Sequence, residues 1–325
     1  MTALYEAQLH HAFHYLRIAW EADELFEQGG EARRRGLELF DGAWSNLQTA
    51  QSWAARHAAE DEAAATLCSD YPNAIAYIIG LRLSPLERVR WLEAAVAASR
   101  LLSDRAAEAG HLTNLGNAYA QLGMTSRAVE SHQQALNIYT ETNDPSSQGE
   151  ALNGLGVAYF LSGQKSRAVE FYERALAVHR DNGDRRGEGQ SLGNLGLVYK
   201  ESGDIEHAVE LYGRQLAIAR EIKDSIGEGN VLGNLGSAYL ALGDTARAAE
   251  LYRDSLRVAR ELGDRRGEAS ALFNISAVCA LLGDRDEAIK YAESALGIFE
   301  RMDDPFADEA RRQLEKLRGG DQRRR

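Results

Sequence analysis

The chain has 325 residues, a formal net charge of −12 and a sequence pI near 5.2. An acidic chain lacks the positive field that non-specific nucleic-acid binding requires. No window approaches the run of about 18 apolar residues that a membrane-spanning helix needs. We therefore expect no nucleic-acid partner and no membrane partner.

The N-terminus and the two cysteines give no sign of a secretory signal, a metal site or a disulfide. The N-terminus shows no basic region followed by an apolar run, so no secretory signal is expected. Cys68 and Cys279 stand far apart, without the spacing of a metal site or a disulfide framework. We expect both to be small buried groups in a cytoplasmic protein.

Residues 1–84 are helical by pattern but follow no repeat. Apolar side chains recur at helical spacing over residues 3–28 and again over 31–58, and Gly29 and Gly30 separate the two stretches. This predicts a helical hairpin in the N-terminal region.

A histidine cluster in the first stretch is the best metal candidate. His10 and His14 lie one helical turn apart, which suits zinc, with His11 beside them. No acidic or cysteine ligand of recognisable spacing accompanies them, which favours surface or packing roles. We therefore predict no metal site.

Beyond this region the chain repeats at a fixed spacing of 40 residues. The pattern Leu-x-x-Leu-Gly, with Ile and Ser in the last copy, begins at Leu112, Leu152, Leu192, Leu232 and Leu272. A glycine splits each copy into two helical stretches, at Gly123, Gly163, Gly203, Gly243 and Gly283. Such a period is typical of a solenoid, in which each unit buries its apolar face against its neighbours.

Two further positions of the repeat carry local predictions. An aspartate closes each copy and is placed to cap the next helix: Asp144, Asp184, Asp224, Asp264 and Asp304. A glycine inside the first helix recurs at 116, 156, 196 and 236, where it costs about 1 kcal/mol against alanine. We expect close approach of the partner helix there, with the small residues at 128, 168, 208 and 248 opposite.

The ends of the repeat array are irregular. Residues 85–102 fit the second helix of an earlier unit, whose first helix would span about 72–83. Pro305 opens a final helix over about 305–317. The predicted organisation is an N-terminal helical region (1–84), a solenoid (85–302), a capping helix (303–318) and a loose tail (319–325).

One copy carries a complete family pattern in Leu192, Leu195, Gly196, Tyr199, Gly203, Ala208 and Tyr212. With its four companions it resembles the tetratricopeptide repeat (TPR), in the longer-helix variety of kinesin light chains, spindle-orientation adaptors and sensor regions of bacterial signal-transduction ATPases. The resemblance covers residues 105–302. It implies an all-α fold, a right-handed α-solenoid, whose first helices line a concave groove for an extended peptide or a partner's helix.

A second resemblance concerns the N-terminal region. The segment from Trp44 to Gln48, with Trp53 beyond it, is similar to segments that precede the repeats in some bacterial signalling ATPases and transcriptional regulators. It implies that the chain is the sensor portion of such a system or a stand-alone relative.

An asparagine recurs beside the core leucine of the first helix, at Asn114, Asn194, Asn234 and Asn274, while the second copy has Asn153 next to Gly154. An amide offers both donors and an acceptor, so a ladder of amides can bind a peptide backbone. In related long-repeat adaptors this position contacts peptide main chain, which implies the same role here. The alternative is that each asparagine bonds the backbone of the adjacent helix.

Other first-helix positions are expected to share the groove: Asn117, Gln121, Val157, Phe160, Leu197, Lys200, Ser237, Leu240, Phe273 and Ala277. An apolar strip with amides between suits an amphipathic peptide or helix. Packing between neighbouring repeats is the alternative role for the apolar members. Lys200 is almost the only cation among them, which argues against a clamp for a terminal carboxylate.

Arg180, Arg220 and Arg260 each precede a glutamate by eight residues. Ion pairs that brace successive repeats are one interpretation, and a basic ridge for an acidic ligand is the other. No catalytic set, phosphate-binding motif or cofactor site can be named, so we expect no enzyme activity and no cofactor.

The sequence thus predicts a peptide- or protein-binding adaptor or sensor. The alternative is a regulatory module of a signal-transduction ATPase or transcriptional regulator that responds to a peptide or small effector. The sequence does not decide whether copies of the chain associate through the exposed ends of the solenoid.

Overall fold

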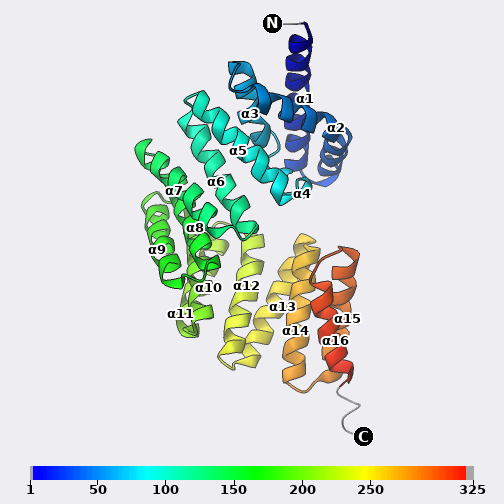
Figure 1. Cartoon of the computed structure of the whole chain (residues 1–325). Helices are drawn as coiled ribbons and strands as arrows, with labels where there is room; N and C mark the ends of the chain where they lie inside the picture. Colours follow the sequence, from blue (N-terminus) through cyan, green and yellow to red (C-terminus); the bar gives the residue numbers. More distant parts are fainter. Residues whose placement is uncertain (1–2, 320–325) are drawn as a thin grey trace. The chain divides into compact units, whose positions relative to one another are not determined.

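The computed structural model describes residues 3–319, and this part of the chain consists of sixteen helices joined by short turns, with no strand (Figure 1). It divides into two compact units, Met1–Arg174 and Ala175–Arg325, each treated by itself below. The division falls within helix α9 (Lys165–Asp181). Within residues 3–319, no helix is both long enough and apolar enough to cross a bilayer. The predicted tail falls outside the described residues, except for Gly319.

The first unit contains the helices before α9: α1 (Ala3–Glu27), α2 (Gly30–His57), α3 (Glu62–Asn73), α4 (Ile79–Arg82), α5 (Pro85–Leu101), α6 (Arg105–Gln121), α7 (Thr125–Glu141) and α8 (Pro145–Leu161). The predicted hairpin of α1 and α2 is confirmed, since these two helices pack against each other. The assignment of residues 1–84 as a region separate from the repeats stays a prediction.

The helix predicted over 72–83 is wrong. The partner of α5 is α3, which begins after Asp61, whose carboxylate accepts the Ala64 N–H. Residues 74–78 form a turn because the buried carboxylate of Asp23 accepts the backbone N–H groups of Tyr77 and Ile78. A prediction made by extending the 40-residue period backward from the repeats cannot detect such a long-range contact.

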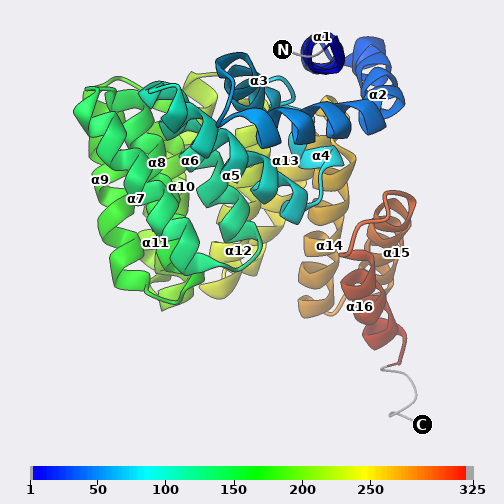
Figure 2. The ribbon, with the colours of Figure 1, turned by 45° about the horizontal axis from the view of Figure 1, so that its top comes forward.

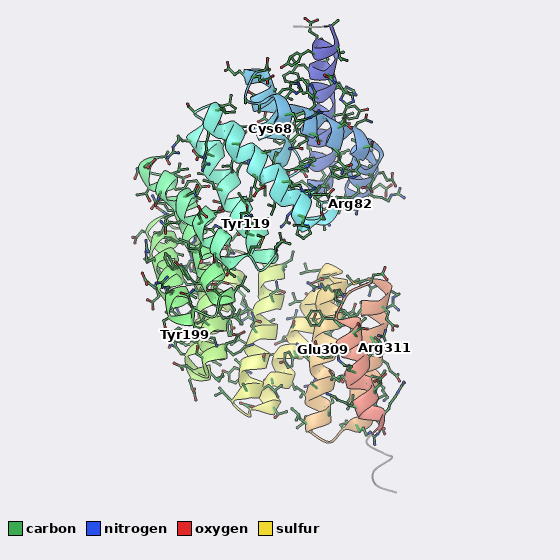
Figure 3. All side chains as sticks on the ribbon, viewed as in Figure 1. Cys68, Arg82, Tyr119, Tyr199, Glu309 and Arg311 are labelled. Atoms are coloured by element: carbon green, nitrogen blue, oxygen red, sulfur yellow. The ribbon has the colours of Figure 1, made fainter. Side chains whose placement is uncertain are left out.

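Aromatic side chains hold the N-terminal helices together. The rings of Trp44 and Trp91 stack at 5.9 Å between α2 and α5, and Tyr71 donates to the Ala12 carbonyl oxygen at 2.8 Å. Cys68 lies fully buried in the same core, and Arg82 pairs with Asp41 of α2 (Figure 3). Cys279, in the second unit, is also buried and free, so the prediction for both cysteines is confirmed.

The second unit contains the helices after α9: α10 (Arg185–Ser202), α11 (Ile205–Glu221), α12 (Ser225–Ala241), α13 (Thr245–Leu262), α14 (Arg265–Leu281), α15 (Arg285–Arg301) and α16 (Ala307–Gly319). Consecutive helices pack as antiparallel pairs, and α14, α15 and α16 lie side by side (Figure 2). This is the helix-pair arrangement of an α-solenoid.

The repeated aspartates cap helices as predicted. Asp184, Asp224 and Asp264 accept the N–H of the third residue of α10, α12 and α14, each at 2.9 Å, and Asp144 does the same for α8. Asp304 accepts the Phe306 N–H just before α16. The starts of α8, α10, α12 and α14 therefore have their caps encoded locally.

The atoms nearest to the glycines inside the first helices belong to rings of the second helix. A Cβ atom at Gly196 or Gly236 would fall 2.6 Å from an edge atom of Tyr212 or Tyr252, and Gly116 meets the His132 ring in the same way. The second helix thus inserts one ring per repeat where the first helix has no side chain.

The predicted arginine–glutamate pairs brace the repeats. Nε of Arg180, Arg220 and Arg260 lies 2.8–2.9 Å from the glutamate eight residues on. Glu268 also accepts from Arg265, and these arginines hold the pKa of its carboxyl below the usual value. Because these arginines are paired with glutamates, they do not form a basic ridge.

Candidate functional site

In the first unit the predicted groove residues differ in how far their side chains are exposed. Asn114, Asn117 and Gln121 are exposed on α6, and Gln121 accepts a hydrogen bond from Arg88. On α8, Val157 and Phe160 are half-buried, and Asn153 is buried with 4% of its surface exposed. The asparagine of this copy therefore lies inside the packing.

In the second unit four of the predicted residues share one hollow, with a volume of about 820 Å³. Asn234 and Ser237 come from α12, Asn274 from α14 and Lys200 from α10. We call this space, between α12 and α14 with the end of α13 behind it, the α12–α14 hollow. Five other predicted residues are half-buried but do not line it: Asn194, Leu197, Leu240, Phe273 and Ala277.

The floor of the hollow is made of small side chains. Gly229 and Gly233 of α12 face Val258 and Ser255 of α13, with Ala259 beside them. A Cβ added at Gly233 would be 3.9 Å from Ser255 Oγ, an ordinary van der Waals contact, so an alanine would fit there. Ser255 Oγ donates to the Gly229 carbonyl oxygen at 2.9 Å, which satisfies the donor of this hydroxyl and leaves its oxygen able to accept.

The recurring asparagine amides of the first helices have no protein partner within the described residues. Within residues 3–319, the side chains of Asn114, Asn194, Asn234 and Asn274 make no hydrogen bond, so the alternative of bonding to an adjacent helix does not hold for them. Each of these amides keeps its two donors and its acceptor available. Asn234 and Asn274 line the same hollow, so the hydrogen-bonding groups of both amides are available to a ligand there.

The charged groups around the hollow are mostly engaged. Arg266 pairs with Asp304 at 2.8 Å and lies over the Phe306 ring. The Phe306 N–H and Arg266 lower the pKa of the Asp304 carboxyl. Lys200 Nζ donates to Ser237 Oγ at 3.3 Å, which ties α10 to α12. The hollow therefore presents amides, one lysine and a small neutral floor.

Sequence reasoning missed several residues of the hollow, chiefly Asn230, Ser255, Arg266 and Phe306. Asn230 precedes Asn234 by one helical turn, so its position could have been found from spacing. Ser255 and Phe306 come from outside the first helices, to which the prediction was confined.

The histidine cluster of α1 lies on a separate surface. His10 and His14 flank a shallow depression with Phe13, Arg17 and Trp20. His11 Nε2 lies 3.3 Å from Asn46 Oδ1. Among residues 3–319, no three His, Cys, Asp or Glu side chains are grouped so that they could hold a metal ion.

Solved structures with the same fold come from several protein classes. BtubC (BKLC) from P. vanneervenii is 22% identical, with 68% of this chain and 93% of that chain covered and a TM-score of 0.61. A Rap protein complexed with Competence and Sporulation Factor is 15% identical, with 98% and 99% covered and a TM-score of 0.60.

A third similar structure is that of a Signal Transduction ATPase with Numerous Domains, with a tetratricopeptide repeat sensor, from Pyrococcus horikoshii. It is 16% identical, with 94% of this chain and 49% of that chain covered and a TM-score of 0.59. At these identities the likeness concerns the fold. No curated protein matches the chain.

The repeats themselves match a family model. The tetratricopeptide repeat model matches residues 108–181, 147–221, 187–261 and 227–301 in overlapping stretches, which together cover more than half of the 325 residues. The match agrees with the helix pairs, the glycine–ring contacts and the aspartate caps described above. The chain belongs to the tetratricopeptide repeat family.

Proposed function

We propose that this protein is a non-enzymatic adaptor or sensor that binds an extended peptide or partner segment in the α12–α14 hollow. The observation that supports this most directly is the pair Asn234 and Asn274, whose amides line one hollow and have no partner within the described residues. The volume of about 820 Å³ lies within the range typical of ligand sites. The similar Rap structure holds Competence and Sporulation Factor, which supports ligand binding on this fold.

The mechanism is recognition by a preformed surface. A peptide backbone alternates N–H donors and C=O acceptors, and an asparagine side chain can satisfy both at once. Because the amides sit on rigid helices braced by the Arg–Glu pairs, little ordering free energy is lost on binding.

The test begins with a library of random peptides displayed on phage and selected on the immobilised full chain. A selected peptide is then titrated by calorimetry into the wild type and the double variant Asn234→Ala/Asn274→Ala. We expect the variant to bind at least about tenfold more weakly, equivalent to roughly 1.4 kcal/mol.

The matched control is Asn182→Ala, at an exposed position in the turn between α9 and α10. It should bind as the wild type does, and all variants should keep the wild-type circular dichroism and melting temperature. If the double variant binds selected peptides with wild-type affinity, the hollow is not the binding site.

A second candidate function is a regulatory sensor module. It is favoured by the likeness to the ATPase from Pyrococcus horikoshii, in which this chain covers 49% of a protein with a tetratricopeptide repeat sensor. A sensor must change conformation on binding, whereas an adaptor need not. Small-angle scattering with and without a selected peptide separates the two, since an unchanged radius of gyration supports the adaptor.

A further inference from the structure

Arg88, near the start of α5, occupies the position that the repeats give to a fully buried alanine. It precedes Ala128 by the 40-residue period, and the alanines at this position have none of their surface exposed: Ala128, Ala168, Ala208, Ala248 and Ala288. In the unit that contains α5 the first helix ends at Asn73, and the four-residue α4 follows it and also packs against α5. The chain therefore has a charged side chain where the regular repeats have a methyl group.

The Arg88 guanidinium is half-buried and has no anionic partner. Nη2 donates to the side-chain oxygen of Gln121 on α6, and within residues 3–319 the guanidinium makes no other hydrogen bond and no ion pair. Burial lowers the pKa of this guanidinium below its usual value. A charge taken partly out of water without an opposite charge is costly, so this arrangement favours the binding of an anion.

The other half-buried arginines of the described chain have stronger partners. Within residues 3–319 only Arg185 and Arg285 share the partial burial of Arg88, and the remaining arginines are exposed. Arg185 pairs with two glutamates, and Arg285 donates to two carbonyl oxygens at the end of α16. Arg88 differs from both because its partner is a single neutral side chain.

Free hydrogen-bond donors surround the guanidinium. Nη1 lies beside Gly80 of α4: a Cβ at residue 80 would be 3.4 Å from Nη1 and would meet nothing else from the rest of the fold within 4 Å. The glycine thus leaves room for an oxygen atom next to Nη1. Gln121 uses its oxygen for Arg88, so its amide N–H groups stay available, and Asn117 one turn earlier on α6 is exposed and without a partner within the described residues.

We propose that Arg88, with Gly80 and Gln121 around it, forms a binding site for one carboxylate group of a ligand. The planar guanidinium presents parallel N–H donors, which match the two oxygens of a carboxylate. One arginine balances one negative charge, whereas a phosphoryl group carries about −1.5 to −2 at pH 7 and would leave an excess charge at this half-buried place. The site lies in the first unit; it goes beyond the proposed function and does not depend on it.

The test follows the Nε–Hε signal of Arg88 by NMR in the full chain labelled with ¹⁵N-arginine, where the signal is identified by its absence from Arg88→Lys. Sodium acetate replaces sodium chloride at constant ionic strength and pH 7. We expect the Arg88 signal to shift along a saturating curve with a Kd on the order of 10 mM. The matched control is Arg174, which is exposed and unpaired within residues 3–319 and should shift only in proportion to concentration.

Two variants change the site while keeping Arg88. Gln121→Glu supplies the missing carboxylate from the protein itself, so it should raise the melting temperature and abolish the saturating response to acetate. Gly80→Ala places a methyl group beside Nη1 in ordinary van der Waals contact, so the chain should still fold. It should weaken acetate binding by about fivefold, as expected for the loss of one hydrogen bond.

A second probe identifies the source of the carboxylate. N-acetylglutamate amide presents it as a peptide side chain, so binding about tenfold tighter than that of acetate assigns the site to an acidic residue of a peptide, and equal binding to a small organic acid. Inorganic phosphate that binds more tightly than acetate overturns the carboxylate class. A response of Arg88 that is as linear as that of Arg174, or that stays saturating in Gln121→Glu, overturns the site.

Discussion

The ring of Tyr212 lies directly against Gly196: a Cβ at residue 196 would fall 2.6 Å from Tyr212 Cε1. Tyr212 is fully buried, so its ring has no room to retreat. The contact joins the first and second helices of one repeat and recurs between Gly236 and Tyr252. It explains why a helix tolerates a glycine at its centre in each regular copy.

We therefore expect Gly196→Ala to destabilise the protein, although alanine favours helices. The overpacking against Tyr212 should cost about 1–3 kcal/mol beyond the gain in helix propensity. Urea denaturation followed by circular dichroism measures the change in the free energy of unfolding.

The matched control for Gly196→Ala is Gly213→Ala. Gly213 is exposed within α11 and has nothing within 4 Å of a Cβ, so this change should stabilise by about 0.5–1 kcal/mol. If both substitutions stabilise equally, the ring contact does not restrict residue 196.

Glu268 should matter more for stability than Glu228. Glu268 accepts from Arg260 and Arg265, whereas Glu228 pairs with Arg220 and has Ser225 where the second arginine would be. We expect Glu268→Gln to lower the free energy of unfolding by about 1 kcal/mol and Glu228→Gln by less.

The pH dependence of Glu268 has a definite sign. Because its carboxyl pKa is lowered in the folded state, its contribution is present above the unfolded value of 4.5 and is lost as the pH falls below it. Melting temperatures of wild type and Glu268→Gln should therefore converge in acid. A difference that grows as the pH falls contradicts this account.

His132 should make the protein acid-sensitive. It replaces the tyrosine of the later repeats, is buried, and within residues 3–319 neither ring nitrogen has a hydrogen-bond partner. Burial lowers its pKa from 6.5 to about 4. Between these two pH values the unfolded chain binds the proton and the folded chain does not, so stability falls as the pH falls through this window.

The full contribution of His132 is present above pH 6.5, and the loss approaches about 3 kcal/mol at pH 4. His132→Tyr installs the ring that packs against the glycine in the later repeats and should flatten the dependence, which urea titrations across the window measure. His111, whose pKa burial also lowers to about 4, would keep part of the slope. An unchanged slope in the variant shows that His132 does not carry the effect.

The repeat array was predictable because its signals are local and recur five times. Asp184 caps α10 by accepting the N–H of Gly187, three residues further along the chain. Gly203 ends the same helix with a φ of 89°. Such contacts depend only on nearby residues, so spacing alone placed the helix pairs. The segment 72–83 was mispredicted because its turn is held by Asp23, about 50 residues away along the chain.

By itself the sequence determined the helix pairs, their caps, the family and the recurrence of asparagine in the first helices, since each follows from spacing along the chain. Only the tertiary structure decided that the glycines face rings and that Asn153 is buried while Asn234 and Asn274 share a hollow. These features depend on the size of side chains that meet across two helices, which the sequence of either helix alone does not encode.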